Sequence, residues 1–289
     1  MKHVLWLAVG LALAPAMVAS AQPAAPAAPT ARGKVVTRGK RGAKAPVAPV
    51  APVPADALTG LVGTDLEGAA RAAAVLGAHE AAAAHEALLD VLALGLHPAV
   101  APAVLAALAV HPGPLDVVTL ARYARHATPS VRAAAVAALA AYPGAEAQTV
   151  VLAALRDTIA PVRAAAALAA GQGRIRAAVD PLMQLLTRGE EPAARGLALL
   201  ADADLVKILV GQLGKVPEPT LAAALGGVLA RPDVTEDIRL DAVRGLGTIQ
   251  DPAALRALGD YVARAPTQPV RVSRQEAEMI VGARAGGGQ

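Results

Sequence analysis

The residues best suited to chemistry in this sequence are the histidines of the segment HEAAAAHE, residues 79–86. A helical zinc site needs two histidines four residues apart, so that both imidazoles face one way. His79 and His85 are six residues apart, which places them about 240° apart around a helix. His79 and Glu86 share a face but lie two turns, roughly 10 Å, apart along the axis. We therefore expect no metal site here.

Nucleophilic catalysis has equally few candidates. Beyond residue 21 the only serines are Ser130 and Ser273, and the chain has no cysteine. Ser130 follows Thr128-Pro129, which is a typical helix start. No serine-hydrolase elbow, phosphate-binding loop or dinucleotide-binding glycine pattern occurs. The paired acids Glu190-Glu191 stand at a predicted helix start, where negative charge is favourable. We therefore expect no enzyme activity, no catalytic residue and no cofactor.

The chain is instead organised by repeated pairs of helices, of which residues 155–186 are the clearest. Asp157-Thr158 can cap a helix, and Pro161 fits its first turn because no N–H is needed there. The glycines of residues 171–173 end that helix. Apolar residues then recur at steps of three and four over residues 175–186, which is the pattern of one helical face. The segment therefore predicts a helical hairpin.

This hairpin recurs at a nearly constant step along the chain. Val131-Arg132 is followed by Val162-Arg163 and then by Ala194-Arg195, at steps of 31 and 32. A fixed period of roughly 20–50 residues is typical of a solenoid, in which each unit buries its apolar face against its neighbours. We predict an all-α fold, an α-solenoid of stacked antiparallel helix pairs over residues 58–284, with residues 285–289 as a flexible C-terminus.

The expected pairs follow the chain with one interruption. The first five pairs are predicted at residues 65–76 with 80–94, 98–110 with 114–126, 128–156, 155–186, and 192–200 with 203–213. A helix at 219–230 then has no clear mate. Residues 237–246 are expected to pair with 252–263, and residues 271–283 form a closing helix whose charges suit a polar outer face.

Two segments carry a resemblance to a known repeat. Residues 157–171, DTIAPVRAAAALAAG, and then 179–186, VDPLMQLL, resemble the HEAT-like repeat of the phycobilisome-lyase type. Residues 237–258, DIRLDAVRGLGTIQDPAALRAL, resemble it even better. The resemblance spans most of residues 65–264. It implies an α-solenoid that serves mainly as a binding scaffold; some relatives act on tetrapyrrole–protein linkages, but no residue here indicates a bilin site.

One set of arginines recurs near the start of the predicted first helices. A cation there opposes the helix dipole, so another interaction must favour it. In similar repeats this arginine pairs with an aspartate of the turn, a relation that the resemblance gives to Arg163 and Asp157. We interpret the set as a structural ladder made of Arg132, Asp157, Arg163, Arg195 and Arg239.

A second set recurs near the ends of the predicted second helices: Arg125, Arg156 and Arg188, at steps of 31 and 32. Stacking would set them in a row about 10 Å apart. The row is either favourable charge at each helix C-terminus or a basic ridge for an acidic partner. In similar repeats the second helices line a concave face, the default binding surface. We predict that partner contacts there come from Tyr123, Arg125, Arg156, Gln184, Arg188, Arg256 and Tyr261.

Residues 1–21 have the form of a signal peptide. A short basic start is followed by an apolar run, Val4–Val18, and by Ala19-Ser20-Ala21, with small residues at the positions that a signal peptidase reads. We predict cleavage after Ala21 and a periplasmic or secreted protein. The alternative is an uncleaved anchor, although about 16 residues interrupted by Pro15 fall short of the roughly 20 that a spanning helix needs. No later segment resembles a membrane span.

Residues 22–57 are predicted to form a disordered Ala/Pro-rich basic tail, because repeated proline forbids helix and sheet. The tail holds six basic residues and one acid, whereas the chain from Ala57 onward holds 20 basic and 22 acidic residues. The formal net charge of +4 therefore resides in the tail. Residues 22–56 are either an arm for an anionic wall or membrane surface, or a solvated spacer.

Three functions remain open from the sequence. The leading one is an exported non-enzymatic scaffold that binds a protein partner on the solenoid. The second is a cell-envelope tether whose basic tail binds anionic wall or membrane. The third is a lyase-like accessory enzyme, which would need a polar pocket with convergent acids and bases that the sequence does not show. Nucleic acid is not an expected partner of an exported protein.

Overall fold

The computed structural model describes residues 52–286. The predicted signal peptide, most of the basic tail and residues 287–289 lie outside this part. Fifteen α-helices and two 3₁₀ helices occur in it, without a β-strand. None of these helices is both long and apolar enough to cross a membrane. The helices are α1 (Ala55–Leu61), α2 (Leu66–Gly77), α3 (Ala82–Leu94), α4 (Ala101–Leu108), α5 (Asp116–Tyr123), α6 (Pro129–Ala138), η1 (Leu139–Ala141), α7 (Ala145–Ala154), α8 (Ala160–Gln172), η2 (Arg176–Ala178), α9 (Val179–Thr187), α10 (Glu191–Leu200), α11 (Ala203–Val210), α12 (Glu218–Leu229), α13 (Glu236–Thr248), α14 (Pro252–Arg264) and α15 (Val272–Gly286).

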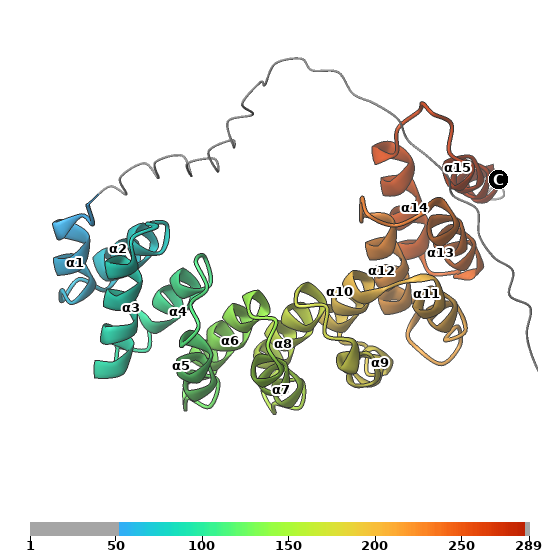
Figure 1. Cartoon of the computed structure of the whole chain (residues 1–289). Coiled ribbons are helices and arrows are strands. Elements are labelled where there is room, and N and C mark those ends of the chain that lie inside the picture. Colours follow the sequence, from blue (N-terminus) through green and yellow to red (C-terminus); the bar gives the residue numbers. More distant parts are fainter. Residues whose placement is uncertain (1–51, 287–289) are drawn as a thin grey trace, which may run out of the picture. The chain divides into compact units, whose positions relative to one another are not determined.

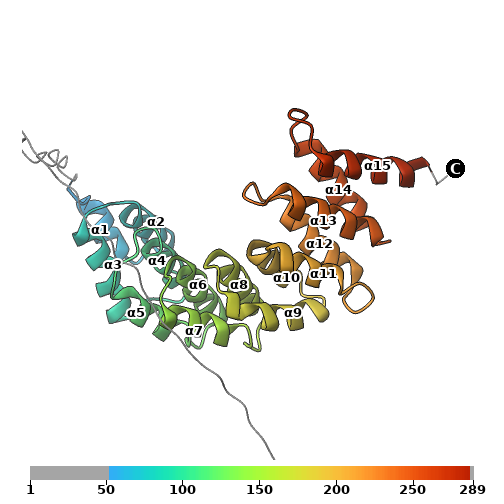
Figure 2. The same cartoon turned by 45° about the vertical axis from the view of Figure 1, so that its right-hand side comes forward.

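The helices alternate between two layers. In the first layer each even-numbered helix from α2 to α14 packs against the next one, as Figures 1 and 2 show for α4, α6, α8 and α10. In the second layer α3, α5 and α7 pack in order, and so do α11, α13 and α15. The two layers enclose a continuous core of alanine, leucine and valine. The all-α prediction of stacked helix pairs is therefore confirmed.

Two ends of the array differ from the predicted bounds. Helix α1 begins at Ala55, before the expected start at residue 58, and Val53 packs against the core. Helix α15 continues to Gly286, beyond the expected end at residue 284.

An Asp side chain caps α2, α11 and α14 by accepting a backbone N–H of the first turn.

Helix α12 has a place that the sequence prediction missed. It packs between α10 and α14 in the first layer, and α13 follows it in the second layer. The predicted pairing of residues 237–246 with 252–263 therefore set α13 in the wrong layer. The positions of proline indicate the layer of each helix from α4 to α14, and the sequence prediction did not use them. Every first-layer helix from α4 to α14 has a proline at its first or second position, where no N–H is needed, and the second-layer helices have none there.

Small residues let neighbouring first-layer helices approach closely. A Cβ atom added at Gly196 of α10 would lie 2.5 Å from the carbonyl oxygen of Ala167 of α8. One added at Gly171 would lie 2.9 Å from the carbonyl oxygen of Gly196. Because both obstacles are backbone atoms, neither can move aside as a flexible side chain does. The α8–α10 contact therefore depends on glycine at these positions.

We predict that Gly196→Ala lowers the free energy of unfolding by about 1–3 kcal/mol, because the added methyl group meets the backbone of α8. Urea unfolding followed by circular dichroism measures the change. Gly259→Ala on α14 is the matched control, since a Cβ there has no neighbour within 4 Å. It is expected to be neutral or to stabilise by up to about 1 kcal/mol, because alanine is the better helix former. Equal effects of the two substitutions would contradict the close-contact explanation.

Candidate partner-binding surface

Arg132 and Arg163 occupy equivalent positions in successive repeats and make the same set of contacts. Nη1 of each donates to two backbone carbonyls of the turn before its own helix, at 2.9–3.1 Å. The other guanidinium nitrogens reach a carboxylate of the next repeat. Arg132 contacts Asp157 at 2.9 Å, and Arg163 contacts Glu190 at 2.9 Å. Each arginine therefore joins its own turn to the turn that follows in the stack.

Asp157 pairs with Arg132 and not, as the resemblance implied, with Arg163. Arg163 reaches only the backbone carbonyl of Asp157, because its own carboxylate partner lies one repeat further on. The Asp157 carboxylate also accepts the N–H of Ile159 at 2.8 Å, so it bonds the turn before α8 rather than the first turn inside it. The hydrogen bond from Arg132, with that from Ile159, holds the pKa of Asp157 below its usual range.

The predicted ladder has these two members and does not extend to the other two arginines. Arg195 pairs with Glu191 of its own helix at 2.7 Å, and both side chains are exposed. Arg239 lies on α13, in the second layer, where its Nη2 donates to the carbonyls of Arg231 and Pro232. Neither of them joins one first-layer turn to the next. Arg195 differs because its carboxylate partner lies on its own helix, and Arg239 differs because α13 belongs to the second layer.

We predict that Arg132→Ala and Asp157→Asn each destabilise the fold by about 1–3 kcal/mol, because the pair is charged and its side chains are only 15% and 17% exposed. A double-mutant cycle from urea unfolding should give a coupling of about 1–2 kcal/mol. Arg71→Ala, which removes an exposed arginine beside Asp65 and Glu67, should cost less than about 1 kcal/mol.

The pH dependence of this contact has a definite sign. Because the pKa of Asp157 is lowered in the folded chain, the contribution is complete above the unfolded pKa of about 3.9 and is lost as the pH falls below it. The acid limb of a stability profile should therefore be shallower in Asp157→Asn than in the unmodified chain. Parallel acid limbs would contradict the assignment.

Each arginine of the predicted row lies one or two residues beyond the end of a second-layer helix: Arg125 after α5, Arg156 after α7 and Arg188 after α9. All three side chains are exposed. Arg188 lies 3.7 Å from a carboxylate oxygen of Glu190. Gln184 is exposed on α9 in the same layer. These four predicted contact residues therefore stand in the second layer, at or near the carboxyl ends of its helices, where positive charge is favourable.

The other three predicted contact residues need correction. Tyr123 and Tyr261 are 7% and 3% exposed, so neither is an exposed anchor. The hydroxyl of Tyr261 lies 2.6 Å from Oγ of Ser273, which is itself buried and bonded to Glu236. Arg256 is exposed but belongs to α14, in the first layer. The seven residues therefore do not share one face, because two of them are buried and α14 belongs to the first layer.

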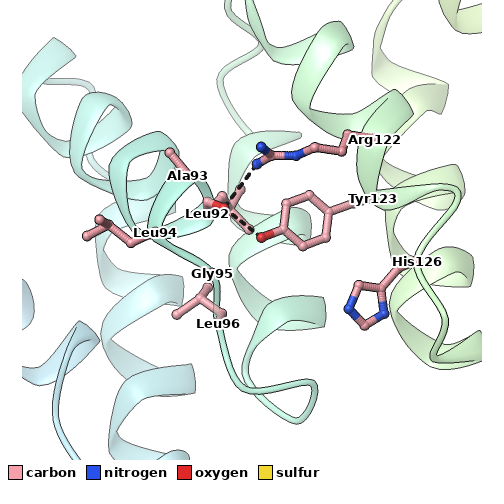
Figure 3. A pocket seen from close by; sticks show the side chains of 8 residues that line it. All are labelled: Leu92, Ala93, Leu94, Gly95, Leu96, Arg122, Tyr123 and His126. Atoms are coloured by element: carbon pink, nitrogen blue, oxygen red, sulfur yellow. Dashed lines mark hydrogen bonds between the residues drawn. The ribbon is translucent and has the colours of Figure 1, made fainter.

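A pocket at the carboxyl end of α3 gives Tyr123 a different role (Figure 3). The hydroxyl of Tyr123 and Nη2 of Arg122 both point from α5 to the carbonyl of Leu92, and donate to it at 2.7 and 3.0 Å. The ring of Tyr123 stacks on His126 with centroids 6.1 Å apart. The pocket encloses about 300 Å³. Tyr123 thus forms its floor, and Leu94, 84% exposed, stands at its rim.

Two further hollows adjoin this pocket. One of about 230 Å³ lies between α1, α2 and α3 and shares the segment 94–96 with the pocket. The other, of about 530 Å³, lies between α5 and α7 and shares Arg122 with it. The three hollows are linked by these shared lining residues, and we name them together the α3–α7 surface. Its exposed members include Val62, Leu66, Leu94, Val118, Arg122, Arg125 and Glu146.

A buried polar cluster at the start of α5 escaped the sequence analysis. Asp116 of α5 is completely buried, and its carboxylate accepts Nε2 of His85 at 2.8 Å, the N–H of Gly113 at 2.7 Å and the hydroxyl of Tyr142 at 2.6 Å. We considered His85 as a metal ligand in the sequence and rejected it. In the structure its imidazole contacts the carboxylate of Asp116. The His-Pro-Gly turn followed three residues later by Asp116 was the available signal.

We predict that Tyr142→Phe destabilises the fold by about 1–2 kcal/mol at neutral pH, because Asp116 loses a donor. Burial, with the hydrogen bond to Asp116 and its charge, raises the pKa of Tyr142 far above the usual 10. The contribution is therefore complete below the unfolded pKa of about 10 and is lost as the pH rises above it. Urea unfolding at about pH 8 and about pH 11 should show a smaller alkaline loss in Tyr142→Phe. An equal alkaline loss of stability in the variant and in the unmodified chain would contradict this role of Tyr142.

Metal-ligating side chains do not cluster in the described part of the chain. Within residues 52–286 no group of three or more His, Asp or Glu residues is placed to hold a metal ion. Nδ1 of His79 accepts the N–H of Ala81 at 3.1 Å, and it lies at the turn before α3. The α3–α7 surface therefore offers apolar and cationic contact area, and the acid–base contact at the start of α5 joins His85 to the completely buried Asp116.

Residues 117–203, which run from α5 to the start of α11, match the family model of HEAT repeats. HEAT repeats are therefore identified in this segment of the chain. The match covers the first segment on which the sequence resemblance was based, residues 157–186, and both ladder arginines, but not the second segment, residues 237–258. No curated protein matches the sequence.

Solved structures resemble this HEAT-repeat chain at low identity. The complex of CpcE and CpcF of phycocyanin lyase from Nostoc has 19% identity and a TM-score of 0.45, covering 84% of this chain and 99% of that chain. Human deoxyhypusine hydroxylase has 16% identity and a TM-score of 0.37, with coverages of 80% and 96%. An engineered protein has 19% identity and a TM-score of 0.32, with the same coverages.

Proposed function

We propose that this HEAT-repeat chain is an exported, non-enzymatic scaffold that binds a protein partner through the α3–α7 surface. The observation that carries the proposal is the exposure of large apolar side chains around connected hollows. Leu94 is 84% and Val62 69% exposed, and Leu115 and Val118 are exposed near α5. Clustered apolar exposure of this kind marks binding surfaces on soluble proteins, because water disfavours it unless a partner covers it.

Charge supports the same surface and indicates the character of the partner. Arg122 and Arg125 line the hollow between α5 and α7, with Glu146 as its acidic member. Arg156 and Arg188 continue the row beyond it at the ends of α7 and α9. A segment that combines apolar residues with acidic ones would complement this arrangement, since opposite charge steers association and apolar burial supplies affinity.

The proposal includes export, which rests on the signal-peptide pattern of residues 1–21. It also includes the absence of catalysis, which is supported by the lack of a metal-binding cluster among residues 52–286 and by the complete burial of Asp116 and Ser273. The predicted tether function, in which residues 22–56 bind an anionic envelope surface, makes a different prediction: the tail alone would determine capture.

Affinity capture from envelope extracts, with cross-linking and mass spectrometry, tests the proposal. Leu94→Glu, and separately the triple change of Arg125, Arg156 and Arg188 to Glu, should each reduce capture of the same partner about tenfold or more. Met279→Glu is the matched control, because Met279 is 66% exposed but lies on α15. Unchanged capture by both surface variants would exclude the α3–α7 surface.

A shortened chain separates the scaffold from the tether. It should start at Ala51, because Val53 packs against the core and a cut further along would disturb α1. If the chain is a scaffold, the shortened chain should capture the same partner as the full chain. If only the tailed chain captures anything, and that capture weakens as salt is added, the tether function replaces the scaffold function.

A further inference from the structure

A separate hollow lies where α12, α13, α14 and α15 meet and has an unusual charge. It encloses about 250 Å³, and four of its ten lining residues are arginines while none is acidic. The arginines come from the turn after α12, from α13, from the end of α14 and from the residue before α15. They are Arg231, Arg239, Arg264 and Arg271. The inference from this hollow, which we name the arginine pocket, is independent of the α3–α7 surface.

Carboxylates neutralise only part of this charge. Arg231 pairs with Asp233 at 2.7 Å, and Arg239 lies 3.9 Å from Glu236. Arg264 donates from Nε to the backbone carbonyl of Asp260. Neither Arg264 nor Arg271 forms an ion pair with any residue between 52 and 286. The pocket therefore keeps about two positive charges without a fixed partner.

Arg271 lies at the N-terminus of α15, where the helix dipole disfavours a positive charge. It immediately precedes α15, and its carbonyl accepts the N–H of Gln275, so its side chain lies beside the positive end of a helix dipole. Arg264, by contrast, lies in the last turn of α14, where the dipole favours a cation. An anion between them would offset the unfavourable position of Arg271 and also meet the positive end of α15.

Arg239 adds a buried donor to the same pocket. The residue is 7% exposed, and its Nη2 alone donates hydrogen bonds, to two backbone carbonyls at 3.1 and 3.4 Å. A guanidinium group has five N–H donors. Burying a guanidinium group costs free energy unless a negative charge and hydrogen-bond acceptors compensate it. Nη1 lies 3.9 Å from a carboxylate oxygen of Glu236, and Nε has no hydrogen-bond acceptor among the described residues. Because every fully buried side-chain nitrogen in this part of the chain has a hydrogen-bond partner, Nε is accessible and can donate to an anion in the pocket.

We propose that the arginine pocket binds a small tetrahedral oxyanion with two negative charges, a phosphate or sulfate group, free or as the end of a small ester. Two uncompensated arginines match a dianion in charge. The planar forks of several guanidinium groups match the geometry of its oxygens better than ammonium groups would. A volume of about 250 Å³ admits such a group with a modest substituent.

Isothermal titration calorimetry of the whole chain at about pH 8, where phosphate is mainly doubly charged, tests the proposal. Inorganic phosphate, sulfate, succinate and acetate are titrated at matched ionic strength. Phosphate or sulfate should bind more tightly than either carboxylate, and the better of the two identifies the source of the group. Tighter binding of succinate or acetate, or no binding of any probe, would overturn the proposal.

Three variants locate the binding. Arg264→Ala and Arg271→Ala should each weaken phosphate or sulfate binding about tenfold or more, because each removes a charge-assisted contact. Arg71→Ala on α2 removes the same charge from an exposed position outside the pocket and should leave the affinity unchanged. Equal loss in all three, or no loss in the pocket variants, would overturn the proposal and assign the binding to the basic tail or to general charge.

A measurement on the unmodified chain guards against a folding defect in a variant. Phosphorus-31 resonance spectra of inorganic phosphate should broaden on adding the protein, and an excess of sulfate should restore the narrow line. A phosphate line that stays narrow in the presence of the protein would overturn the proposal without reference to any variant.

Discussion

The whole array depends on one constraint: no helix pair here can bury its apolar face alone. The residues are mostly alanine, valine and leucine, which offer little area each, so stability requires many close contacts between successive pairs. Glycine at 171 and 196 brings α8 and α10 to backbone contact. Arg132 and Arg163 act at the same junctions, since each holds its own turn and a carboxylate of the next. Packing and electrostatics thus act between neighbours, and stability is distributed along the stack.

Charge is used differently at the two ends of the described chain. Near α3 to α7 it borders apolar hollows, where arginine rows stand beside exposed leucine and valine. Near α12 to α15 it is concentrated in a hollow of small volume without acidic lining. The first arrangement suits a broad surface that excludes water over apolar groups. The second suits one compact anion. One repeat architecture therefore carries two different charged surfaces, because the turns that join its helices vary while the layers do not.

Periodicity was enough to predict the helices and their stacking, because a constant repeat step and an apolar pattern of helical period are local properties. It failed at α12, where spacing changes and the proline at the helix start was the better guide to the layer. The candidate contact residues show the same division. Arginines at helix ends were correctly placed on the outside, whereas Tyr123 and Tyr261 are inside because their hydroxyls find buried acceptors. The Asp116 cluster combines three distant segments, and such a meeting cannot be read from spacing alone.

The double hydrogen bond to the carbonyl of Leu92 has a further consequence. A carbonyl at a helix end ordinarily turns to water, and the residues after it remain free to move. Here Arg122 and Tyr123 both hold it, which fixes the last turn of α3 and the direction in which Leu94 projects. A molecule that covers Leu94 thus meets a side chain on an already ordered backbone. Preorganisation of this kind lowers the entropy lost on association, so contact area converts more fully into affinity.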